Sequence, residues 1–107
     1  MLVNTICLLV KGDPIESVLL ARKKRGFGEG KIVAAGGTVE ADETVVQAAA
    51  REIQEELSVT IELEDLERAA RIEFYFPGKP EWNRVVFVYL ARKWAGEPVE
   101  SDEVNPQ

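Results

Sequence analysis

Residues 37–59, GTVEADETVVQAAAREIQEELSV, constrain the fold of this chain more than any other segment. Thr44 and Gln47 have the spacing of a capping box, and the acidic residues directly before Thr44 suit a helix N-terminus. From Thr44 to Leu57 there is no Gly or Pro, and three consecutive alanines are strong helix formers. The run therefore predicts a helix that begins after Thr44 and ends near Leu57.

The predicted helix has two chemically distinct faces. At about 100° per residue, one face is apolar and must be buried. It comprises Val46, Ala49, Ala50, Ile53 and Leu57. Glu52, Glu55 and Glu56 are spaced i, i+3 and i+4, so they project together from a neighbouring face, where they repel one another. Such a cluster fits a solvated surface, or a site where a divalent cation neutralises it.

The available donor atoms narrow the choice of cation. The chain has no histidine and one cysteine, so a zinc or copper site is hard to build. Carboxylate oxygens suit Mg²⁺, or alternatively Mn²⁺. Gly36 and Gly37 precede the helix and would let the backbone approach a metal or a phosphate closely. The same pair is also typical of an ordinary tight turn, and both interpretations can hold together.

Length and composition set the limits of the molecule. At 107 residues we expect one domain, residues 1–107, and 46% apolar with 30% charged residues is typical of a globular protein. No apolar stretch is long enough to span a membrane, and no signal peptide is evident, so we expect a cytoplasmic location. A net charge of -6 argues against binding to nucleic acid polymers. Cys7, within an apolar run, is expected to be a core thiol.

Apolar and turn-forming segments alternate along the chain and predict an α/β (α+β) fold. Residues 2–11 predict a strand, which a turn at residues 12–14 joins to a second strand in a hairpin. The other expected segments are the second strand at 17–22, a basic glycine-rich loop at 23–31, strands at 32–35, 60–62, 70–76 and 83–94, a turn or short helix at 63–68, a turn at 77–80, and a polar tail from Gly96.

The helix and its flanks also follow a longer pattern, G-x5-E-x7-R-E-U-x-E-E-x-G-U, in which U is apolar. The chain fits it at every fixed position but one, because Ser58 stands where the pattern has glycine. The matching residues are Gly37, Glu43, Arg51, Glu52, Ile53, Glu55, Glu56 and Val59. This resembles the signature of the Nudix hydrolases, which implies a mixed sheet sandwiched by helices, with the signature helix carrying a metal ion.

Two further segments, RKKRGFG and GEPVESDE, resemble the MutT-type branch that hydrolyses oxidised purine nucleoside triphosphates such as 8-oxo-dGTP. The resemblance implies that Glu52, Glu55 and Glu56 hold the ions, with the Gly36 carbonyl as a further ligand. It also implies that Glu100 binds metal or assists the base, although Glu100 also suits a solvated loop. The substrate would lie against Gly36, Gly37, Lys23 and, beside the base, Thr5; for Lys23 a simple surface role is the alternative.

The implied reaction is attack of water on phosphorus, which releases a nucleoside monophosphate and pyrophosphate. Either Glu56 or Glu100 would take the proton. We expect Arg51 to orient Glu52 or Glu43 through a charge-assisted hydrogen bond rather than to touch substrate. Glu43 is likewise expected to support the ligands rather than to bind the ion.

Three departures from the family pattern leave alternatives open. Ser58 would cost about 1 kcal/mol if its position needs a positive φ. Val33 replaces an asparagine that hydrogen-bonds the base in the related enzymes. The chain stops at Gln107, before the part that in the family carries a base-recognising segment and a second helix. We therefore expect an uncovered apolar sheet face and a homodimer that covers it, or a truncated chain.

Two alternative functions stay open. One is a weakly catalytic module that binds a nucleotide or a protein partner, and the other is a structural dimer-forming fragment.

Overall fold

The computed structural model describes residues 1–24, 29–101 and 104–107. Its elements, in chain order, are β1 (Leu2–Lys11), β2 (Ser17–Val18), β3 (Ala21–Lys23), β4 (Ile32–Val33), β5 (Ala35–Thr38), α1 (Val45–Leu57), the 3₁₀ helix η1 (Leu63–Asp65), β6 (Leu66–Phe74), the 3₁₀ helix η2 (Pro80–Trp82), β7 (Arg84–Ala91) and β8 (Val104–Pro106). The predicted α+β class is confirmed.

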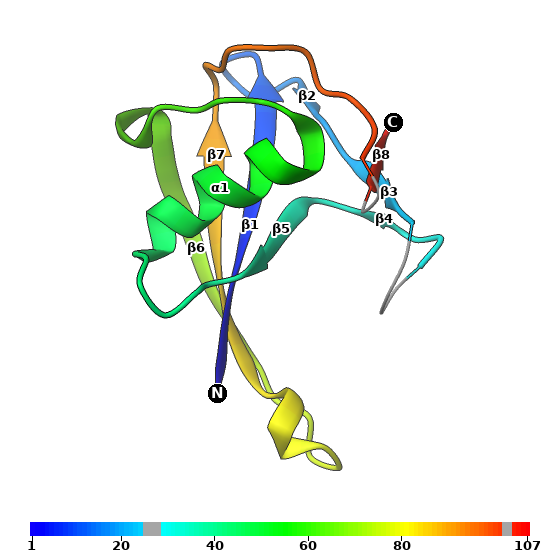
Figure 1. Ribbon diagram of the computed structural model, residues 1–107, viewed down its shortest axis with the longest axis vertical. Coiled ribbons are helices and arrows are strands. Elements are labelled where there is room, and N and C mark those ends of the chain that lie inside the picture. Colours follow the sequence, from blue (N-terminus) through cyan, green and yellow to red (C-terminus); the bar gives the residue numbers. More distant parts are fainter. Residues whose placement is uncertain (25–28, 102–103) are drawn as a thin grey trace.

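The strands form two sheets (Figure 1). In the larger sheet the order is β2-β1-β7-β6, and β5 also pairs with β1. β1 runs parallel to β7, from Leu2 opposite Arg84 to Leu9 opposite Ala91, whereas the other pairs are antiparallel. The smaller sheet has the order β4-β3-β8. β1 thus lies at the centre of the larger sheet. Its side chains point alternately to the two faces of the sheet and line the sites described below.

Helix α1 covers one face of the larger sheet, in front of β1 and β7 in Figure 1. Strand side chains alternate between faces, so Cys7 and Leu9 of β1 point into the core beneath the helix. The buried cluster consists of Cys7, Leu9, Ala21, Ala35, Ile53, Leu57, Val59, Ile61, Ala91 and Val104. No helix of the described residues covers the opposite face, where Leu2, Ile72 and Phe74 are exposed. In that part of the chain the sheet is therefore covered on one side rather than sandwiched.

The helix ends as the sequence predicts. Ser58 follows α1 in the left-handed conformation, with φ 60° and ψ 31°, and its N–H donates to the Gln54 carbonyl at 2.9 Å. A serine carries a Cβ, which is unfavourable in this conformation and explains why the family pattern has glycine at this place. None of the described helices has the length and apolar character needed to cross a membrane.

The first strand, the hairpin at residues 12–14 and the helix are confirmed, but several other segments differ from prediction. The predicted strand 17–22 is divided between the two sheets, as β2 and β3. Residues 60–62 form no strand, only an isolated bridge between Thr60 and Ala95. Strand β6 begins at Leu66, earlier than predicted, and β7 ends at Ala91 instead of residue 94. These differences arise because pairing partners decide strand limits, and partners are distant in sequence.

The polar tail contains a strand that was not predicted. Residues Val104–Pro106 form β8, which pairs antiparallel with β3. The short, polar sequence has no strand pattern of its own, so the pairing is imposed by the neighbouring strand. The tail thereby adds an edge strand to the smaller sheet, with Val104 paired opposite Lys23.

Candidate functional site

The capping box fixes where the helix begins. The Gln47 N–H donates to the Thr44 hydroxyl at 3.2 Å, and the Thr44 N–H donates to the Gln47 side-chain oxygen at 2.8 Å. This reciprocal pair satisfies two backbone donors that a helix N-terminus otherwise leaves free. The rotation of α1 on the sheet then sets which residues meet β5.

A pocket of about 390 Å³ lies between α1 and β5. Its lining consists of Lys23, Gly36, Gly37, Thr38, Glu40, Glu52, Glu55 and Glu56. The structure thus brings together the three glutamates predicted from the helix spacing, together with both glycines and the predicted lysine. Glu40 was not singled out from the sequence, because its position depends on the chain between β5 and the helix.

Glu56 is buried, which the helix-face prediction did not anticipate. It is 7% exposed, and its Oε2 accepts the Gly36 N–H at 3.1 Å. The observed buried face of α1 contains Ala48 and Glu56 in addition to Ala49, Ile53 and Leu57. Val46 and Ala50, which were predicted to be buried, are only half-buried. β5 lies against the glutamate side of the helix, and this rotates the buried face toward Glu56.

Gly36 and Gly37 lie in strand β5, not in the predicted tight turn. Neither has a positive φ in the structure, so their role is to provide space. A Cβ at Gly37 would lie 2.6 Å from both carboxylate oxygens of Glu52. A Cβ at Gly36 would overlap the Thr5 carbonyl oxygen and stand 3.0 Å from the Ile6 Cα. The close approach of α1 to β5 therefore requires Gly37, and the close approach of β1 to β5 requires Gly36.

Arg51 links the carboxylates around the pocket. Its guanidinium donates to Glu43 at 2.7 and 3.0 Å, to Glu52 at 2.7 Å and to Glu55 at 3.2 Å. It also donates to the Thr38 carbonyl at 3.0 Å. The predicted charge-assisted contacts of Arg51 with Glu52 and Glu43 are present, and its orienting role stays a prediction. Glu43 does not line the pocket.

These contacts shift the ionisation of the carboxyl groups. Hydrogen bonding to Arg51 lowers the pKa of Glu43 below its ordinary value. Burial raises the pKa of Glu52, and the Arg51 contact opposes this effect without cancelling it. The pKa of Arg51 is raised by its hydrogen bonds to Glu43 and Glu52. Burial therefore disfavours the charged form of Glu52, which a cation beside it would favour.

The donor types at the pocket fit a hard divalent cation, because the side-chain ligands offered are all carboxylate oxygens. The positions of these carboxylates, however, do not form a metal site in the structure described. Across the described residues, no three His, Cys, Asp or Glu side chains are grouped closely enough to hold a metal ion. Glu52 and Glu55 are directed toward Arg51, and Glu56 toward the Gly36 N–H. The carboxylates that surround the pocket are engaged with partners of the protein itself.

Glu100 does not line the pocket. It forms an ion pair with Lys24, whose ammonium group also donates to the Ser101 carbonyl at 2.9 Å. Both contacts join the chain before β8 to the end of β3, since these strands pair. The role predicted for Glu100 as a ligand or a base stays a prediction.

A second pocket, of about 320 Å³, continues from the first because it shares Lys23, Gly36 and Gly37 with it. Thr5 lies along this pocket, is 1% exposed, and its hydroxyl has no hydrogen-bond partner in the described part of the chain. Asn4, which the sequence did not single out, lies next to it, and its Oδ1 is buried without a partner in the same residues. Such orphaned acceptors are unusual in folded proteins.

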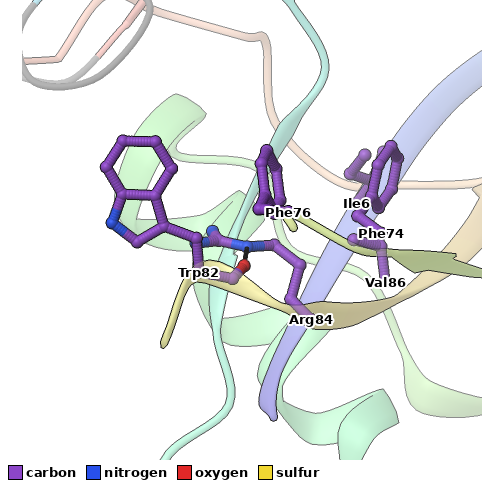
Figure 2. Close-up of a pocket in the computed structure, with 6 residues that line it drawn as sticks. All are labelled: Ile6, Phe74, Phe76, Trp82, Arg84 and Val86. Atoms are coloured by element: carbon purple, nitrogen blue, oxygen red, sulfur yellow. Dashed lines mark hydrogen bonds between the residues drawn. The ribbon is translucent and has the colours of Figure 1, made fainter. Parts of the chain in front are cut away.

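A third pocket, of about 450 Å³, adjoins the second because both include Ile6, Arg84 and Val86. Figure 2 shows its lining, which is completed by Phe74, Phe76 and Trp82. The rings of Phe76 and Trp82 meet edge to face, with centroids 5.8 Å apart. We call the three connected pockets the groove. Its aromatic end was not predicted, because β6, η2 and β7 meet there only in the folded chain.

Comparison with known proteins agrees with this geometry. The family model described as NUDIX domain matches residues 2–105. The chain is 46% identical over 90 residues to an "Oxidized purine nucleoside triphosphate hydrolase" of Danio rerio, covering 84% of this chain and 56% of the relative. It is 39% identical over 92 residues to a protein of that name from Mus musculus, covering 86% of this chain and 57% of the relative. The chain thus spans little more than half the length of these relatives.

Solved structures give the same picture of the fold. The crystal structure of a MutT NUDIX hydrolase from Burkholderia pseudomallei superposes with a TM-score of 0.82 at 30% identity, covering 97% of this chain and 78% of that one. A MutT protein structure from Bacillus halodurans superposes with a TM-score of 0.79 at 28% identity, covering 100% and 67%. The fold of this chain is therefore shared with these proteins.

Proposed function

The chain belongs to the NUDIX domain family, and we propose that it hydrolyses the diphosphate linkage of a nucleoside triphosphate to a monophosphate and pyrophosphate. The observation that carries this proposal is the groove. A carboxylate-lined end with one lysine is continuous with an end lined by Phe74, Phe76 and Trp82. A nucleotide has the matching chemistry, because a divalent cation can join its anionic phosphates to the carboxylates while its flat aromatic base lies at the other end.

At the acidic end we propose that Glu52, Glu55 and Glu56 hold a divalent cation, Mg²⁺ or Mn²⁺, with the Gly36 carbonyl as a further ligand. Such an ion supplies charge neutralisation for phosphate oxygens and lowers the pKa of bound water. Oxygen donors and the family support this assignment, although Arg51 and the Gly36 N–H now engage the carboxylates. Ion binding then has to compete with these internal contacts.

The remaining chemistry belongs to side chains of the protein. Lys23 lines both the acidic pocket and its neighbour, so it is placed to contact a phosphate. Arg51 holds Glu52 in position through the 2.7 Å contact. We propose that Glu56 accepts the proton from the attacking water, because it lines the acidic pocket while Glu100 does not. Glu100 stays the second candidate for this step.

For the base, we propose a purine, with the oxidised form 8-oxo-dGTP as the first nucleotide to test. The support is the printed name of the two curated relatives. Thr5, Lys23, Gly36 and Gly37 would lie along the bound nucleotide, since all four line the middle of the groove. Val33 is in the same pocket and offers no polar contact.

A panel of nucleoside triphosphates tests the proposal by measuring pyrophosphate release with and without Mg²⁺. Glu56→Gln should reduce turnover at least a hundredfold, on the scale of losing a general base. Glu64→Gln, at an exposed position outside the groove, is the matched control. Binding of Mn²⁺ followed by electron paramagnetic resonance gives a readout that does not depend on turnover. Unchanged activity and Mn²⁺ affinity in Glu56→Gln would refute the assignment.

One observation favours a second function, a module that binds nucleotide without efficient turnover. No group of three metal-ligating side chains is assembled in the described residues, and Arg51 occupies two of the predicted ligands. Nucleotide binding by calorimetry without pyrophosphate release in Mg²⁺ or Mn²⁺ would favour this alternative.

We also propose a homodimer that covers the part of the sheet face opposite α1 that lies outside the groove, because Leu2 and Ile72 are more than two-fifths exposed there. Light scattering coupled to size exclusion measures the mass directly. A monomer at all concentrations would contradict the homodimer. The cytoplasmic location stays a prediction.

A further inference from the structure

Arg84 is a charged side chain in an otherwise apolar part of the groove. It opens strand β7 and is half-buried. Figure 2 shows its guanidinium beside the backbone of Trp82. The other residues around this pocket contribute aromatic rings and aliphatic groups. The guanidinium therefore has few acceptors of the protein around it in this pocket and can donate to a bound ligand.

The protein supplies only one of these acceptors. The Nε–H of Arg84 donates to the Trp82 carbonyl at 2.8 Å, which fixes the plane of the guanidinium. Neither terminal nitrogen has a hydrogen-bond or ion-pair partner in residues 1–24, 29–101 and 104–107. By contrast, Arg51, Arg68 and Arg71 all have side-chain partners. Four N–H donors of Arg84 are therefore available in a fixed orientation at the aromatic end of the groove.

We propose that Arg84 determines base specificity by donating to the 6-carbonyl of a purine, so that the groove prefers 6-oxopurines to 6-aminopurines. The inference rests on the proposed nucleotide-binding function and deepens it. A guanidinium has donors only, and the 6-oxo group of guanine, hypoxanthine or 8-oxoguanine is an acceptor. The 6-amino group of adenine presents a donor at the same place, which leaves the arginine unsatisfied.

A base is a better occupant here than a phosphate. Phe74, Phe76 and Trp82 give the pocket a predominantly apolar lining, which suits a flat ring. Lys23 lines the acidic pocket and the middle pocket but not the aromatic pocket, and it is the cation that we propose for the phosphates. If Arg84 acted only as a positive charge, all purine nucleotides would bind equally well. The experiment below distinguishes this alternative from recognition of the 6-carbonyl.

Calorimetric binding of non-hydrolysable α,β-imido analogues of dGTP, dITP and dATP tests the proposal on the intact chain. We expect dGTP and dITP analogues to bind about tenfold or more tightly than the dATP analogue, on the scale of one good arginine–base contact. In Arg84→Met, which keeps the length but removes the donors, the ratio should fall to within about twofold. Arg84→Lys keeps the charge without the fork and should recover only part of the preference.

Arg92→Met is the matched control. Arg92 is exposed, also donates to a main-chain oxygen, that of Gly12 at 3.1 Å, and does not line the groove. Its replacement should leave the base preference unchanged. Equal binding of the three analogues by the native protein, or a preference that persists in Arg84→Met, would overturn the role of Arg84. Base-selective binding of the analogues, with no pyrophosphate release from dGTP, dITP or 8-oxo-dGTP themselves, would instead leave that role intact and refute the proposed hydrolysis.

Discussion

Replacing Ser58 with glycine should stabilise the protein. Ser58 is exposed and adopts φ 60° and ψ 31° directly after α1. A residue with a Cβ in this conformation costs about 1–2 kcal/mol, because the Cβ crowds the following carbonyl oxygen. Glycine removes that cost but loses more backbone freedom on folding, by about 0.5–1 kcal/mol. The difference predicts a net gain of about 0.5–1 kcal/mol in the free energy of unfolding.

The gain can be measured by urea unfolding followed by circular dichroism. For a domain of this size it corresponds to a rise in Tm of about 2–8 °C. The Ser58 N–H bond to Gln54 involves only the backbone, so glycine retains it. Ser58→Ala is the control, since it removes the hydroxyl and keeps the Cβ, and it should show no gain. A Ser58→Gly midpoint equal to or below that of both other proteins, at an unchanged m-value, would refute the reasoning.

Three further predictions concern the pocket, its supporting carboxylate and the core. Gly37→Ala should displace the Glu52 carboxylate, lowering Mn²⁺ affinity and turnover at least tenfold while changing unfolding by only about 1 kcal/mol; normal Mn²⁺ affinity would contradict it. Arg51 lowers the pKa of Glu43, so the stability that this ion pair adds is present above the ordinary value of 4.5 and is lost as pH falls through the lower folded value. Urea midpoints measured from pH 7 to pH 3 should therefore fall less in Glu43→Gln than in the native protein, and parallel curves would count against the pair. Burial raises the pKa of Cys7 to about 12, so stability is lost as pH rises from 9.0 toward that value. At pH 8 the thiol should react with a disulfide reagent only after urea is added, and rapid reaction of the folded chain would exclude a buried thiol.

Local sequence chemistry predicted the helix and the acidic pocket well. The capping box, the alanines and the spacing of Glu52, Glu55 and Glu56 are all contained within one short segment, so their consequences can be read without the rest of the chain. The burial of Glu56 depends on β5, which packs against it. A tight turn was one of the two interpretations of Gly36 and Gly37, since a glycine pair does not reveal that β1 will lie against the first and α1 against the second.

Features that depend on distant segments could not be predicted. Arg84 lies beside Phe74 and Phe76 because β6 and β7 pair, and no local pattern distinguishes it from an ordinary surface arginine. The burial of the Asn4 Oδ1 atom likewise follows from the neighbours of β1 on both sides. The residues proposed to recognise the base are consequently harder to predict from this sequence than the acidic helix.

The smaller sheet has a consequence for the order of folding. Its strands β3 and β8 are separated by about eighty residues, and Lys23 is paired directly with Val104. Closing so long a loop costs entropy that only the completed sheet can offset, so such a pairing forms slowly. During synthesis, α1 and β1 are available long before β8 emerges. The acidic helix is therefore expected to form first, and the side of the pocket that contains Lys23 last. A newly made chain thus acquires its cluster of negative charges before the position of the lysine beside them is fixed.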